Sequence, residues 1–131
     1  MSEEAQTITP RAVVIGHGGF AAGLISAVDQ ITGRGALLIG LSNSGMAPQD
    51  MQQLVKSYVD QGIRVVFTDL PGGSATVCAR RVSAASDGVI VVSGVNLPAL
   101  LDFVFSSDAA AESAERAAAR GRETITVLGQ R

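Results

Sequence analysis

Short apolar runs alternate along the chain with segments whose apolar residues recur every three or four positions. The continuous runs predict strands, at residues 12–15, 36–41, 63–68, 89–93 and 124–128. The spaced patterns predict five helices. The first covers residues 19–31, the second runs from Pro48 to a stop at Gly62, and the third is capped by Ser74 and ends near Asp87–Gly88. The fourth has an inward face of Leu97, Leu100, Leu101, Val104 and Phe105, and the fifth covers residues 108–120.

Strands that alternate with helices in this way are typical of a parallel α/β sheet with right-handed crossovers. We expect a doubly wound sheet in the order 2-1-3-4, with helices on both faces and the ligand crevice between the carboxyl ends of the first and third strands. The segment 124–128 is expected to be an additional edge strand. The length of 131 residues fits one domain over residues 11–131, preceded by a loose polar leader over residues 1–10.

Candidate functional residues follow the two strands that flank the expected crevice. His17, the one histidine of the chain, lies in a glycine-rich turn after the first strand, and Asp69 follows the third. The segment Gly72–Gly73–Ser74 then leads into the next helix. Because the carboxyl ends of parallel strands meet at one edge of a sheet, we expect His17, Asp69 and the amides of Gly72–Gly73–Ser74 to share a cleft.

This set of groups points to a particular chemistry. A carboxylate that accepts a hydrogen bond from one imidazole N–H fixes the tautomer and leaves the other ring nitrogen as a nucleophile or base. Free N–H groups at a helix N-terminus bind anions. A nucleophilic imidazole beside a phosphate-sized pocket predicts a histidine that becomes phosphorylated. The plainer interpretation is a histidine in a polar turn next to an ordinary N-cap serine.

A second motif overlaps the same turn. Residues 16–21 match the pattern G-x-G-x-x-A between a strand and a helix, which is the fingerprint of dinucleotide-binding domains. The acidic residue expected at the end of the next strand is absent, because Leu41 is followed by Ser42–Asn43–Ser44. A nucleotide-binding domain is therefore a separate hypothesis, which predicts measurable affinity for nucleotides.

Composition narrows the function classes. The net charge of −2 argues against a nucleic-acid binder, which needs a basic face. The single cysteine, Cys78, excludes a disulfide within the chain and a multi-cysteine metal site, and it fits the reducing cytoplasm. The most apolar window, residues 88–105, contains Asn96, Pro98 and Asp102, so it predicts a strand, a turn and a helix rather than a membrane span. No metal or cofactor is expected.

Four segments together resemble the enzyme IIA domains of the mannose-type sugar phosphotransferase system. They are the strand and turn at Val13–Leu24 with its His17–Gly18–x–Phe20–Ala21, the segment Asp69–Leu70–x–Gly72–Gly73–Ser74, the turn Gly94–Val95–Asn96–Leu97–Pro98, and the ending Gly121–Arg122–Glu123. They span most of the predicted domain in the family's order and spacing.

The resemblance implies a phosphoryl carrier. His17 would accept a phosphoryl group on Nε2 from the phosphocarrier protein HPr and pass it to a IIB component, which phosphorylates a sugar during uptake. Asp69 would hold the Nδ1–H, while Gly72, Gly73 and Ser74 would receive the phosphoryl oxygens. The carrier would meet the membrane only through the IIC and IID transporter components. Family members are homodimers that exchange a C-terminal strand, a role that would fall to residues 124–128.

Several positions depart from the family's pattern. Ala75 stands where many members have proline, Val77–Cys78 replaces an asparagine-containing helical turn, and Pro71 takes a place that is often aromatic. These positions belong to the rim that docks partners, so they leave the sugar and the downstream acceptor open. Two alternatives are a regulatory module that senses phosphorylation state without transport, and a phosphotransfer subunit for dihydroxyacetone kinase.

Overall fold

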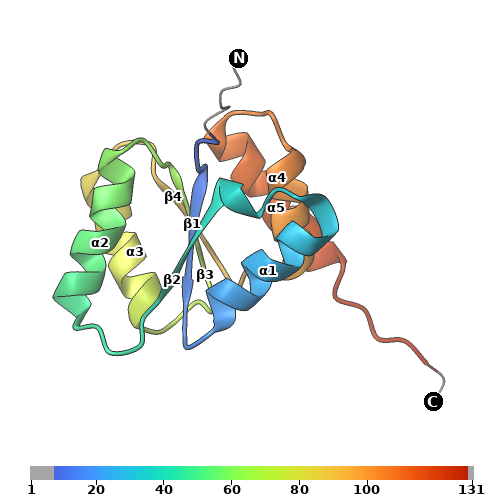
Figure 1. Cartoon of the computed structure of the whole chain (residues 1–131), viewed down its shortest axis with the longest axis horizontal. Coiled ribbons are helices and arrows are strands. Elements are labelled where there is room, and N and C mark those ends of the chain that lie inside the picture. Colours follow the sequence, from blue (N-terminus) through green and yellow to red (C-terminus); the bar gives the residue numbers. More distant parts are fainter. Residues whose placement is uncertain (1–7, 130–131) are drawn as a thin grey trace.

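The computed structural model describes residues 8–129 and shows one four-stranded parallel sheet in the order β2-β1-β3-β4 (Figure 1). The strands are β1 (Ala12–Gly16), β2 (Leu38–Ser42), β3 (Val65–Thr68) and β4 (Ile90–Ser93). Helices α2 (Pro48–Asp60) and α3 (Ser74–Ala85) cover one face, and α1 (Phe20–Thr32), α4 (Leu97–Phe105) and α5 (Ala110–Glu123) cover the other, with a short 3-10 turn at Gly35–Leu37. The predicted doubly wound order is confirmed.

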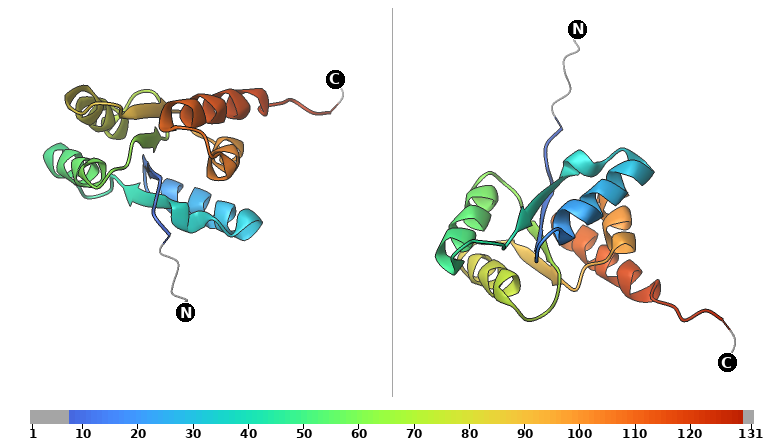
Figure 2. Two further views of the ribbon diagram at one scale, coloured as in Figure 1. Left: turned by 90° about the horizontal axis from the view of Figure 1, so that it is seen from above. Right: turned by 60° about the horizontal axis from the view of Figure 1, so that its bottom comes forward.

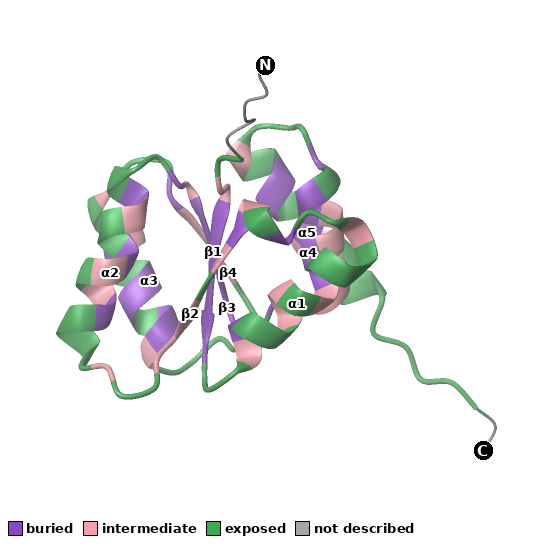
Figure 3. Ribbon diagram, in the orientation of Figure 1, coloured by how far each residue is buried: buried purple, intermediate pink, exposed green. Residues whose placement is uncertain are grey.

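Two apolar cores lie on the two faces of the sheet, and the alternation of side chains along β1 feeds both of them. Val14 packs with Phe67 and the helices α1, α4 and α5, whereas Val13 and Ile15 pack with the helices α2 and α3. All five residues of β1 are buried, as the purple central strand of Figure 3 shows. A strand covered on both faces must be apolar at every position, which explains the continuous run in the sequence.

Strand β2 lies at an edge of the sheet, and its sequence pattern overstates its burial. Leu38 is buried, but Ile39 and Leu41 are only partly covered and Gly40 is exposed. The strand has one hydrogen-bonded neighbour, β1, in the described chain. A continuous apolar run therefore does not distinguish a central strand from an edge strand.

The predicted strand over residues 124–128 is wrong for the described chain. Helix α5 continues to Glu123, and the residues after it form no ladder with the sheet within residues 8–129. They extend away from the body of the protein, as both views of Figure 2 show, with Ile125, Val127 and Leu128 exposed by 77%, 97% and 88%. Exchange of this segment with a second copy stays a prediction.

Gly121 was expected to end the last helix, but it lies inside α5. A Cβ at this position would lie 2.6 Å from Oδ1 of Asn96 and 3.0 Å from the Cβ of Ala99. The glycine therefore allows α5 to pack closely against the start of α4, and the helix ends three residues beyond the predicted Arg120.

The apolar window at residues 88–105 folds as strand β4, a turn and helix α4, as predicted. Among the described helices, none combines the length and apolar character needed to cross a bilayer. Residues 8–10 precede β1 without regular secondary structure. The first seven residues of the predicted leader lie outside the described range.

Candidate functional site

The carboxyl edge of the sheet brings His17 and Asp69 together. Strands β1 and β3 are neighbours, with Ile15 paired to Thr68, so the residues that follow them emerge side by side. The imidazole Nδ1 lies 2.6 Å from Oδ2 of Asp69, and the backbone N–H of His17 donates to the same oxygen at 2.9 Å. The carboxylate thus fixes both the ring and the turn that carries it.

The environment of Asp69 determines the tautomer of His17. The Asp69 side chain is only 8% exposed, whereas that of His17 is 59% exposed. Burial raises the pKa of Asp69, but the hydrogen bonds from the His17 ring and amide and the nearby imidazole outweigh it, so the pKa falls below its ordinary value of 3.8. An ionised carboxylate only accepts hydrogen bonds, so in the neutral imidazole the proton is on Nδ1 and the lone pair is on Nε2.

Only one oxygen of Asp69 makes these contacts. Oδ1 is buried and has no hydrogen-bond partner among the described residues. A buried polar atom without a partner costs free energy, which makes Asp69 dependent on the two donors that His17 supplies.

Gly16, the last residue of β1, makes room for the carboxylate. A Cβ here would lie 2.9 Å from Oδ2 of Asp69 and 2.8 Å from Cδ2 of Phe20. A Cβ at Gly19 would meet nothing within 4 Å, and its φ of −88° suits any residue. The two glycines of one turn therefore differ sharply in their tolerance of a side chain.

We expect Gly16→Ala to displace the Asp69 carboxylate from His17 and to destabilise the fold by about 1–3 kcal/mol through overpacking. The NMR signal of the hydrogen-bonded Nδ1–H should be lost, and the free energy of unfolding in urea should fall. Gly19→Ala is the matched control and should preserve both. An unchanged Nδ1–H signal in Gly16→Ala would contradict the role given to this glycine.

The loop between Asp69 and α3 forms the second part of the site. The Thr76 side chain holds this loop by donating a hydrogen bond to the Leu70 carbonyl. Gly73 has a φ of +95°, a conformation that suits glycine, and it occupies the N-cap of α3 without any side-chain cap. A Cβ on Gly73 would lie 3.7 Å from Cε1 of His17, so the start of α3 faces the imidazole.

Ser74 was expected to be the N-cap, but it is the first residue of α3. The turn made by Gly73 places the cap one residue earlier. The first-turn amides of α3 have no acceptor within the helix, because its first internal bond runs from Val77 N–H to Gly73. Unpaired amides at the start of a helix, here including that of Ser74, are groups that can donate to an anion. Gly72 is exposed and has open space around it.

Asn43 is a site residue that the sequence analysis did not single out as functional. It follows β2, and its backbone N–H donates to the Gly16 carbonyl at 3.0 Å. Its side-chain Nδ2 donates to Oγ of Ser74 at 3.3 Å. The signal that could have found it is its place directly after a strand that neighbours β1, at the same edge of the sheet.

Charged residues are few in the loops that form the site. The three loops that form the site, residues 16–19, 42–47 and 69–73, contain no lysine or arginine, and Asp69 is their one acidic residue. Within residues 8–129, no group of three His, Cys, Asp or Glu side chains could hold a metal ion. Cys78, in α3, is buried against the core. The groups that the start of α3 could offer to an incoming anion are therefore backbone N–H groups and the Ser74 hydroxyl.

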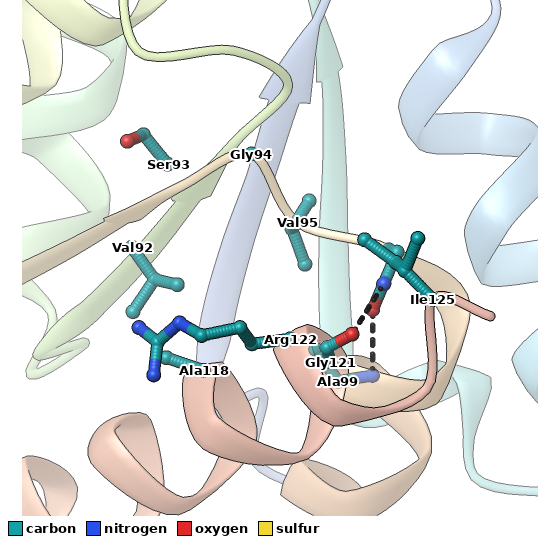
Figure 4. A pocket seen from close by; sticks show the side chains of 10 residues that line it. Val92, Ser93, Gly94, Val95, Ala99, Ala118, Gly121, Arg122 and Ile125 are labelled. Atoms are coloured by element: carbon teal, nitrogen blue, oxygen red, sulfur yellow. Dashed lines mark hydrogen bonds between the residues drawn. The ribbon is translucent and has the colours of Figure 1, made fainter.

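The two remaining segments of the resemblance meet at the α4–α5 junction. Asn96 caps α4, with Oδ1 accepting from the Ala99 amide at 3.1 Å and Nδ2 donating to the Gly121 carbonyl at 3.0 Å (Figure 4). Beside this junction is a cavity of about 210 Å³, lined by Ser93, Val95, Arg122 and Ile125 among others. These contacts between α4 and α5 explain why the sequence has an asparagine at position 96 and a glycine at position 121.

Comparison with known proteins gives a consistent result. Residues 11–120 match the family model described as "PTS system fructose IIA component". The structure is similar to phosphotransferase system component EIIA from Streptococcus agalactiae, with 23% identity, a TM-score of 0.83, and 91% of this chain and 97% of that one covered.

Two further solved structures share the fold. The mannose/sorbose-specific IIA subunit from Enterococcus faecalis is 18% identical, with a TM-score of 0.80 and coverage of 94% of this chain and 97% of that one. The IIA protein associated with the fucose utilization operon of Streptococcus pneumoniae is 22% identical, with a TM-score of 0.72 and coverage of 94% and 96%. No curated protein sequence matches the chain.

Proposed function

The chain belongs to the family of mannose-type IIA components of sugar phosphotransferase systems, and from that premise we propose that it carries a phosphoryl group on His17. The donor is the phosphohistidine of HPr, and the acceptor is a IIB component that phosphorylates a sugar during uptake. The observation that carries the proposal is the bond between Nδ1 of His17 and Asp69, which leaves Nε2 free beside the open start of α3.

The transfer step follows from this geometry. The Nε2 lone pair attacks the phosphorus atom, a new N–P bond forms, and the N–P bond of the donor histidine breaks and returns its electron pair to that donor. The ring of His17 keeps its Nδ1 proton and becomes positively charged, and Asp69 stabilises that charge. Phosphoryl transfer through a loose transition state depends mainly on positioning and electrostatic stabilisation.

The start of α3 receives the phosphoryl oxygens. We expect the amides of Gly72 and Gly73 and the hydroxyl of Ser74 to donate to them, a role that the approach of Gly73 to the His17 ring supports. The same contacts serve the return step, in which the phosphoryl group leaves Nε2 for the IIB component and the Nε2 lone pair is restored.

Intact-mass measurement tests this proposal. The protein is incubated with phosphoenolpyruvate, enzyme I and HPr, and we expect one acid-labile phosphoryl group, which a IIB component then removes. A parallel reaction without HPr controls for direct transfer. No mass gain in a folded protein, with HPr itself phosphorylated, would overturn the proposed function.

We further propose that the protein is a homodimer in which residues 124–128 pair with β4 of a second copy. β4 is the other edge strand, and its Ile90, Val91 and Val92 are only partly buried. A groove of about 410 Å³ follows it along α5. The exposed apolar tail offers the alternating β-forming sequence that such an edge would bind.

Removal of residues 124–131 is expected to convert this dimer into a monomer, because the tail supplies the exchanged strand. Light scattering after size-exclusion chromatography measures the mass. Removal of residues 130–131 alone is the control and should leave a dimer. A dimer that survives the longer truncation would place the interface elsewhere.

A further inference from the structure

We propose that Asn43 is a positioning residue for phosphoryl transfer, which aims the hydroxyl proton of Ser74 at the phosphoryl group on His17. The inference rests on the proposed function of His17. Asn43 lies in the loop between β2 and α2. Among the hydrogen bonds described at the site, its side chain is the only one that this loop contributes. Asn43 is half-buried in that loop.

The direction of the hydrogen bond gives Asn43 its effect. The amide Nδ2 donates to Oγ of Ser74 at 3.3 Å, so the serine oxygen acts as an acceptor in this contact. A serine hydroxyl has one proton and two lone pairs. When one lone pair accepts from Asn43, the proton remains available for another acceptor. Ser74 follows Gly73, which faces the His17 ring, so a phosphoryl oxygen at the start of α3 is that acceptor.

A second contact keeps Asn43 in place without its side chain. The backbone N–H of Asn43 donates to the carbonyl of Gly16, the residue before His17, at 3.0 Å. Parallel pairing of Gly16 with Ser42 supports the same register. Substitution of the side chain therefore leaves the loop attached to the His17 turn and removes only the link to Ser74.

Asn43→Asp separates this role from a packing role. Aspartate has nearly the shape of asparagine, but its carboxylate only accepts hydrogen bonds. It would take the Ser74 proton for itself and add a negative charge near the incoming phosphoryl group. If Asn43 merely filled space, aspartate would be tolerated better than alanine. If Asn43 donates to Ser74, aspartate is the more damaging substitution.

The experiment measures the rate at which phosphorylated HPr transfers its phosphoryl group to the protein. We expect Asn43→Ala to slow transfer about tenfold, which corresponds to the upper end of the range for one hydrogen bond between neutral groups, and Asn43→Asp to slow it further. Ser74→Ala should be slowed at least as much as Asn43→Ala. The double variant Asn43→Ala/Ser74→Ala should match Ser74→Ala, because Asn43 acts through that hydroxyl.

Ser44→Ala, at an exposed position in the same loop, is the control and should keep the wild-type rate. The inference is overturned if Asn43→Ala behaves like this control, if the two alanine effects add, or if aspartate is tolerated better than alanine. A wild-type protein that takes up no phosphoryl group overturns the proposed function and this inference with it. Melting temperatures of all variants confirm that each one is folded.

Discussion

His17→Ala is expected to abolish phosphorylation completely while the protein stays folded. The chain has no second histidine that could accept the group. The His17 side chain is 59% exposed and lies outside both apolar cores, so its removal leaves the packing intact. Intact mass after reaction with phosphorylated HPr measures the first effect, and circular dichroism checks the second. Phosphorylation that persists in His17→Ala would assign the acceptor to another residue.

The same substitution should have a measurable effect on its neighbour. Without the imidazole, Asp69 keeps the backbone donor of residue 17, and its burial is no longer offset by the ring. We therefore expect the pKa of Asp69 to rise in His17→Ala, as measured by NMR titration of the carboxyl carbon. This readout reports on the pair even when no phosphoryl donor is present.

Asp69→Asn is expected to slow phosphoryl transfer by about 100-fold and to keep the fold. An amide at this position lacks the negative charge that stabilises the phosphorylated ring, and it can present an N–H to Nδ1 and favour the wrong tautomer. Initial rates with phosphorylated HPr measure the loss. Asp60→Asn, at an exposed carboxylate that pairs with Lys56 in α2, is the matched control and should transfer at the wild-type rate. Full-rate transfer in Asp69→Asn would refute the orienting role.

The lowered pKa of Asp69 adds a pH dependence to this comparison. A carboxyl group whose pKa is lower in the folded state stabilises the fold above its unfolded-state pKa, and that stabilisation is lost as the pH falls through the folded-state value. For Asp69, this value lies below 3.8. The difference in free energy of unfolding between wild type and Asp69→Asn should therefore shrink below about pH 4, as urea titrations can measure.

The order of the four strands could be predicted from the sequence. Four apolar runs that alternate with helices indicate a doubly wound sheet, and the usual strand order of such a sheet is known. That topology was enough to bring His17 and Asp69 together. Asn43 was not predicted as a site residue, since a loop has no periodicity and nothing in the sequence shows that its amide reaches Ser74 across 31 positions.

Two other differences between the sequence-based prediction and the structure have simple physical causes. A glycine that ends a helix and a glycine that admits a neighbouring helix look alike in sequence, so the role of Gly121 depends on Asn96, which contacts it only in the fold. Residues 124–128 have the composition of a strand, but a strand also needs an edge to pair with. Within the described chain they lie along none, so a strand at these residues requires an edge from another molecule.

The scarcity of charged residues in the three loops of the site has a consequence for the energetics of the proposed phosphoryl transfer. A lysine or arginine beside the phosphohistidine would form an ion pair with it and lower its free energy, which would make the group hard to release. Backbone N–H groups and the Ser74 hydroxyl would bind it more weakly. We therefore expect the N–P bond of a phosphorylated His17 to keep its high group-transfer potential, so that exchange with a donor histidine is readily reversed. The phosphorylated fractions of the upstream and downstream proteins would then set the direction in which the phosphoryl group moves.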